Sequence, residues 1–188
     1  AGYHPPVKSP KPELEPELSG SPEQLTEVLR QVIEERVPFN RHLGLKLKGF
    51  DRRRAIAELT LALRPEHIGN AVRGMAHGGL LAALVDAAAG AAAALTLDDL
   101  LQAPTLATVD MRVDYLLPAR GPELRAVSSV MRSGRSVVVV RTDVFDDDGG
   151  LVALGTNSFT VDRSAVDDGP PANDPPRSAS GRALWRRA

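Results

Sequence analysis

The stretch from Leu80 to Leu97 constrains the fold of this 188-residue chain more than any other segment. Most of its residues are Ala and Leu, which have high helix propensity, and its only charged residue is Asp86. A helix that is apolar on every side is typical of a buried helix. We therefore expect the chain to build its core around this helix.

An apolar run of about eighteen residues also raises the possibility of a membrane span. A central Asp86 costs roughly 2.5–3.5 kcal/mol on insertion scales, and Ala and Gly drive insertion only weakly. The segments on either side alternate between apolar and polar residues, as amphipathic strands do. The run is therefore predicted to be a core helix, with no membrane insertion.

Composition excludes several classes of function. The chain has no cysteine, so a disulfide, a thiolate metal site and a cysteine nucleophile are all ruled out. A net charge of -1 gives no electrostatic footprint for a nucleic-acid partner. No cluster has metal-ligand spacing, and no serine lies in a nucleophile elbow. We expect no metal and no cofactor, and the absence of a signal-peptide pattern favours a cytoplasmic location.

The two ends of the chain differ in composition from its middle. Residues 1–20 contain five prolines and few large apolar side chains, which predicts a flexible arm, and residues 163–188 are predicted to be a disordered tail. Residues 21–162 are predicted to form one domain. It begins with an amphipathic helix from Ser21 to about Val37, and Phe39–Gly44 is expected to be a loop.

Six segments around the central helix show the patterns of strands. The last four are separated by short turns, which implies an antiparallel sheet. One long helix packed on such a sheet is an α+β architecture, and the segment from Pro65 to Gly74 is expected to be irregular. The predicted strands are residues 45–50, 55–61, 105–116, 124–132, 136–145 and 151–161.

His77-Gly78-Gly79 opens the central helix, and Asp86 follows nine positions after the histidine. With the strand from Thr108 to Ala119 and the later hairpins at Gly134-Arg135 and Asp148–Ala153, this pattern resembles the hotdog-fold acyl-CoA thioesterases. The chain resembles the types of phenylacetate degradation and 4-hydroxybenzoyl-CoA hydrolysis. The resemblance covers residues 39–162, and it implies a curved antiparallel sheet wrapped around a long central helix.

Asp86 is the strongest catalytic candidate, because a buried charge is costly unless it has a partner or a function. The resemblance implies that it either activates water as a general base or attacks the thioester as a nucleophile. The alternative is a structural Asp held by a partner group at a dimer contact. The Gly78 N–H at the helix start can donate to the oxyanion, and His77 is expected to shape the helix entry.

Five further residues are predicted to bind substrate. Gly79 lacks a Cβ and allows close approach of a ligand. Asn70 lies one residue before the position, here Ala71, where family members often carry Asn or Gln, and is expected to position substrate or water. The resemblance also implies that the turn containing Arg132, Arg135 and Ser136 meets the nucleotide end of CoA, where Arg suits phosphate.

The sequence therefore predicts an acyl-CoA thioesterase that releases free acid and CoA, with a non-catalytic acyl-CoA-binding module as the alternative. Gly78 and Asp86 are eight residues apart, about 12 Å along one helix. A base and an oxyanion donor must both reach one reacting group. We therefore expect a homodimer with sites built from two chains, and the family implies that dimers often pair into a homotetramer.

Overall fold

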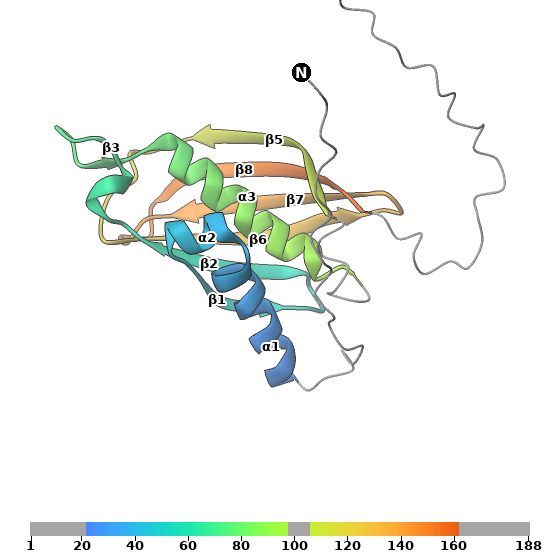
Figure 1. Cartoon of the computed structure of the whole chain (residues 1–188). Helices are drawn as coiled ribbons and strands as arrows, with labels where there is room; N and C mark the ends of the chain where they lie inside the picture. The colour runs from blue at the N-terminus through green and yellow to red at the C-terminus, as the bar shows by residue number, and fades with distance from the viewer. Residues whose placement is uncertain (1–21, 98–105, 162–188) are drawn as a thin grey trace, which may run out of the picture.

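The computed structural model describes residues 22–97 and 106–161 (Figure 1). The predicted N-terminal arm, the predicted C-terminal tail and the connection at residues 98–104 lie outside the described residues. In the described part of the chain, helices pack on an antiparallel sheet, which confirms the predicted α+β architecture.

All six predicted strands are present, and their ends shift by only one or two residues. They form one antiparallel sheet in the order β1-β2-β6-β7-β8-β5, so that β1 and β5 are its edges. Alternating apolar and polar residues specify such strands well, because successive side chains point to opposite faces. The bounds are β1 (Leu45–Asp51), β2 (Ile56–Ala62), β5 (Ala107–Tyr115), β6 (Glu123–Ser133), β7 (Val137–Phe145) and β8 (Leu151–Thr160).

The apolar run forms α3 (Gly78–Ala94), which lies along one face of the sheet and contacts β2, β5, β6, β7 and β8 (Figure 1). Leu84, Val85 and Ala88 are fully buried there. On β8, a Cβ built on Gly155 would collide with Val85, so the glycine allows the helix to approach the strand closely. Among the described residues, no helix has the length and apolar character needed to cross a membrane.

Three short helices precede the sheet: α1 (Pro22–Gln31), the π-helix η1 (Val32–Arg36) and α2 (Pro38–Leu43). The prediction of a loop at Phe39–Gly44 is therefore wrong. The preceding helical stretch ends at Arg36, close to the predicted end, but Pro38 also starts a new helix, because a proline at the first helical position lacks only an N–H that would have no partner. Gly44, with φ of 77°, then ends α2 in the left-handed conformation.

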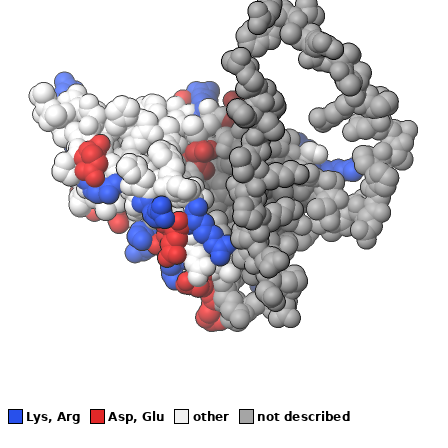
Figure 2. All heavy atoms as spheres, viewed as in Figure 1, with Lys and Arg blue, Asp and Glu red and all other residues white. Residues whose placement is uncertain are grey.

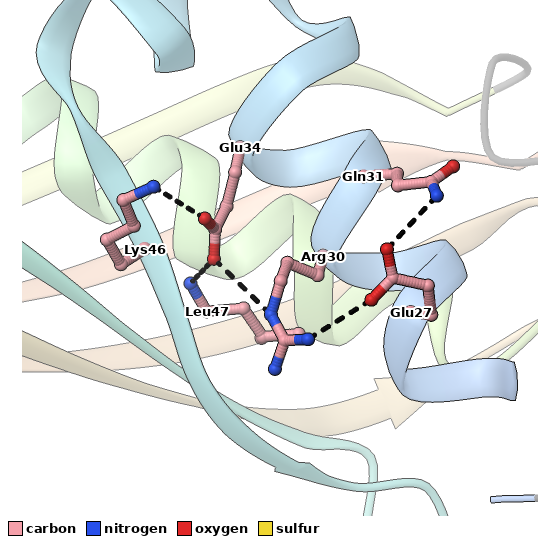
Figure 3. A network of polar contacts seen from close by, with 6 residues as sticks. All are labelled: Glu27, Arg30, Gln31, Glu34, Lys46 and Leu47. Carbon is pink, nitrogen blue, oxygen red and sulfur yellow. Dashed lines mark hydrogen bonds and ion pairs between the residues drawn. The ribbon is translucent and has the colours of Figure 1, made fainter. Parts of the chain in front are cut away.

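Charged groups fasten the π-helix to the first strand (Figure 3). The Glu34 carboxylate accepts hydrogen bonds from Lys46 Nζ at 2.7 Å and from the Leu47 N–H at 3.0 Å. Arg30 lies between Glu34 and Glu27 and forms an ion pair with each. Figure 2 shows charged groups of both signs gathered in the region of α1, while the surface over the start of α3 carries few charged groups. The π-helix is thereby held against β1.

The segment from Pro65 to Gly74, predicted to be irregular, contains short regular elements. A 3-10 helix, η2 (Pro65–His67), leads into a two-stranded antiparallel sheet of β3 (Ile68–Asn70) and β4 (Met75–Ala76). The His77 N–H donates to the His67 carbonyl at 2.8 Å, so this small sheet is joined directly to the start of α3. Strands of two or three residues are too short to leave an alternating pattern in the sequence.

Candidate active site

Asp86 lies in the middle of α3 and is held by side chains from two strands. Its Oδ1 accepts hydrogen bonds from Thr108 Oγ1 on β5 at 2.9 Å and from Asn157 Nδ2 on β8 at 3.1 Å. No hydrogen bond from the described part of the chain reaches its other oxygen, Oδ2. The carboxylate is partly exposed. One oxygen is thus fixed in place, while the other accepts no hydrogen bond from the described residues.

Sequence reasoning missed Asn157, which is fully buried. It lies on the inward face of β8 between Gly155 and Phe159, and an amide among such residues needs a polar partner. Its Oδ1 has no hydrogen-bond partner among the described residues. A polar residue on a buried strand face is therefore the sequence signal that could have identified Asn157. The pattern alone does not reveal which group Asn157 contacts.

The start of α3 presents a free backbone donor. His77 is the N-cap, and its Nδ1 accepts a hydrogen bond from the Gly79 N–H at 2.9 Å. The N–H groups of Leu80 and Leu81 bond to the His77 carbonyl. Within the described ranges, the Gly78 N–H has no partner. It lies at the positive end of the helix dipole, where a developing negative charge is stabilised.

Tyr115, at the end of β5, secures this helix start. Its hydroxyl donates to the Gly78 carbonyl at 3.0 Å, and its ring would lie 3.4 Å from a Cβ at Gly78. The edge strand β5 thus supports both chemical features of α3, because Thr108 binds Asp86 and Tyr115 binds Gly78. No sequence signal distinguished Tyr115 from the other apolar residues of that strand.

One chain does not bring the predicted site residues together. Gly78 and Asp86 are separated by about 12 Å along α3, because the helix is continuous between them. Asn70 is exposed, and its Oδ1 accepts from the Arg73 N–H at 3.1 Å in the turn between β3 and β4. Arg132, Arg135 and Ser136 line a separate hollow of about 330 Å³ where β6 turns into β7.

A buried histidine lies beside the helix start. His67 and His77 both line a hollow of about 290 Å³ next to Gly79. Burial lowers the pKa of His67 from its ordinary value of 6.5, and the positive charge of Arg64 lowers it further. An Arg64 Nη lies 2.9 Å from His67 Nε2. Because a guanidinium can only donate, this contact favours the neutral imidazole.

Comparison with known proteins identifies the family. Residues 73–153 match the model of the thioesterase superfamily. The medium/long-chain acyl-CoA thioesterase YigI of Salmonella typhimurium is 33% identical over 149 residues, which cover 74% of this chain and 95% of the relative. The corresponding protein of Escherichia coli K12 is 31% identical over the same shares of the two chains.

Solved structures agree with this assignment. A thioesterase-superfamily protein of Shewanella oneidensis has 35% identity and a TM-score of 0.64, covering 76% of this chain and all of that one. The phenylacetic acid degradation protein PaaI of Thermus thermophilus, solved as a point mutant, has 27% identity and a TM-score of 0.56, covering 66% and 98%. The chain therefore belongs to the thioesterase superfamily and is a thioester hydrolase with the hotdog fold.

Proposed function

We propose that this enzyme hydrolyses acyl-CoA thioesters to a free acid and CoA. The name of its YigI relatives supports an acyl-CoA substrate. The observation that carries the chemistry is the Asp86 carboxylate, which lines an apolar cavity. Its Oδ1 is held by Thr108 and Asn157, while its Oδ2 accepts no hydrogen bond from the described residues. A carboxylate fixed by one oxygen presents the other in a defined direction.

In the proposed reaction Asp86 acts as a general base. Its free oxygen takes a proton from water, and the water oxygen attacks the thioester carbonyl carbon. The tetrahedral oxyanion accepts a hydrogen bond from a Gly78 N–H at a helix start. The C–S bond then breaks, and the leaving thiolate takes the proton back from Asp86. Direct attack by Asp86, forming an anhydride, is the alternative route.

The proposed site uses Asp86 of one chain and Gly78 of another, because a single straight helix holds them apart. The exposed edge strand β5 supports a dimer. Val109, Met111 and Tyr115 on this strand are 59%, 38% and 55% exposed, and its outer edge is unpaired among the described strands. Pairing β5 with a second copy would satisfy that edge and cover these apolar side chains.

The turn between β6 and β7 is proposed to bind the nucleotide part of CoA. On β7, Val140 pairs with Asn157 of β8. Ser136 lies four residues before Val140, which is about 13 Å along an extended chain. Arg132 and Arg135 beside it are exposed. Both guanidiniums suit phosphate, because their donors form a fork that matches two oxygens. The turn thus lies about four residues along the sheet from the strand position that pairs with Asn157, the partner of Asp86.

The variant Asp86→Asn tests the proposal. The amide is nearly isosteric but neither basic nor nucleophilic, so we expect the rate of acyl-CoA hydrolysis to fall about 10²–10⁴-fold. Asp148→Asn, at an exposed hairpin tip, is the matched control and should keep wild-type activity. Unchanged turnover in Asp86→Asn would contradict the assignment. Tight acyl-CoA binding without turnover by the wild type would instead favour the non-catalytic binding module.

A further inference from the structure

A cavity of about 260 Å³ extends from Asp86 between α3 and the N-terminal helices. On the α3 side it is lined by Ala87, Gly90, Ala91 and Ala94, and Val28 and Val32 line it from α1 and η1. Among the residues that the structure describes, Asp86 is the only charged one in the lining. An apolar space that begins at the proposed catalytic carboxylate can hold an apolar part of the substrate.

The cavity exists because α3 carries small side chains along this face. Gly90 lies one turn after Asp86. A glycine inside a helix makes the helix less stable than an alanine would. Packing does not require the glycine, because a Cβ at Gly90 would lie 3.8 Å from the Phe159 ring, an ordinary contact. A longer side chain at this position would instead occupy the cavity. Gly90 therefore determines how much of the space is open.

The length of the cavity suggests what fits inside. From Asp86 to Ala94 the helix advances eight residues, about 12 Å. An extended alkyl chain advances about 1.25 Å per carbon, given C–C bonds of about 1.5 Å and angles near 111°. The wall from Asp86 to Ala94 therefore matches a straight chain of about nine or ten carbons.

We propose that this cavity binds the alkyl part of the acyl group, and that Gly90 sets a preference for straight chains of about eight to ten carbons. This inference rests on the proposed acyl-CoA thioesterase function. Each methylene buried in such a space improves binding about fourfold. Selectivity should therefore rise steadily with chain length and stop rising where the cavity ends.

The test is kcat/KM for straight-chain acyl-CoA thioesters from two to sixteen carbons. For the wild type we expect a rise of about fourfold per methylene that ends near ten carbons. Gly90→Leu should move that end point to about four to six carbons. Gly49→Leu is the matched control: its Cβ would have no neighbour within 4 Å, and it lines a different hollow, between α1 and β1. Its chain-length profile should equal that of the wild type.

If Gly90→Leu does not fold, two variants of Val32, which lines the cavity from η1, test the same proposal. Val32→Phe should shorten the preferred chain, and Val32→Ala should lengthen it. Shifts in those opposite directions support the proposal, and profiles parallel to the wild type in all folded variants overturn it. The same measurements separate the acyl cavity from the thioesterase activity. Absence of turnover at every chain length contradicts the thioesterase proposal. Turnover in variants whose chain-length preference equals that of the wild type contradicts only the proposal that this cavity binds the acyl chain.

Discussion

Asp86 depends on two side chains that are distant in sequence, Thr108 and Asn157. The lone carboxylate could be predicted from the sequence, because it interrupts an otherwise apolar run. Its partners could not, because which residue of β8 faces Asp86 depends on how α3 crosses the strand. The same limit applies to Tyr115, whose hydroxyl reaches Gly78 from a strand thirty-seven residues away.

Asn157 is expected to position Asp86. Asn157→Leu removes the hydrogen bond to the carboxylate, which is worth about 1.5–3 kcal/mol, and kcat should fall roughly 10- to 100-fold with KM little changed. The melting temperature should hold or rise, because the buried Oδ1 without a partner is removed as well.

Thr156→Val provides the control, since Thr156 is an exposed neighbour on the same strand. Loss of its hydroxyl group should leave kcat unaltered. If Asn157→Leu lowers kcat only in proportion to a loss of folded protein, Asn157 has a structural role and does not position the base.

The contact between α3 and β8 fixes where Asp86 lies. Gly155 has no room for a Cβ because Val85 fills the space, whereas Gly90 on the helix has room for one. Gly155→Ala should therefore lower the free energy of unfolding by about 1–3 kcal/mol, the usual cost of overpacking. Gly90→Ala should raise it by about 0.5–1 kcal/mol. Urea unfolding of both variants measures the difference, and equal effects would contradict this account of the contact.

The buried His67 beside the start of α3 should make the stability of the protein depend on pH. Its pKa is lowered in the folded protein, so the unfolded chain binds a proton more readily. The stability contributed by neutral His67 is thus complete above pH 6.5 and is lost as the pH falls below that value. The loss is at most about 1.4 kcal/mol per pH unit.

Urea unfolding between pH 8 and pH 5 should show this loss in the wild type relative to His67→Gln, which has no group that titrates at that position. A stability difference between the two proteins that stays constant across this range would show that protonation of His67 does not affect folding.

Elements differed in how well the sequence predicted them. The six strands and α3 were predicted because their patterns run over many residues and agree with what they bury. The helix α2 was missed because Pro38 fits both the end of one helix and the first position of the next. The strands β3 and β4 were missed because their pairing is set by tertiary contacts, including the bond from the His77 N–H to the His67 carbonyl.

The arrangement of the sheet bears on how two copies of the chain assemble into a dimer. The crossover through α3 places β5 at an edge, next to β8, and that edge carries the residues that bind both Asp86 and Gly78. Two copies joined at β5 about a two-fold axis would form two equivalent sites. An antiparallel arrangement of the two α3 helices would bring Gly78 of one chain to Asp86 of the other.

Complementation between two inactive variants tests this shared site. Asp86→Asn removes the base, and Gly78→Pro removes the N–H donor. Proline suits the first helical position, and the extended conformation of His77, with φ of -68° and ψ of 133°, is the one preferred before proline. Each variant alone should be nearly inactive while remaining folded.

When the two variants are unfolded and refolded together in equal amounts, about half of the dimers should be mixed, and each mixed dimer should contain one intact site. About a quarter of wild-type activity should therefore return, because the intact site combines Gly78 from one variant with Asp86 from the other. If each site lay within a single chain, every site in a mixed dimer would still have one defect, and no activity would return. Mixed dimers verified by mass spectrometry and devoid of activity would contradict the shared site, as would full wild-type activity from a monomer at assay concentration.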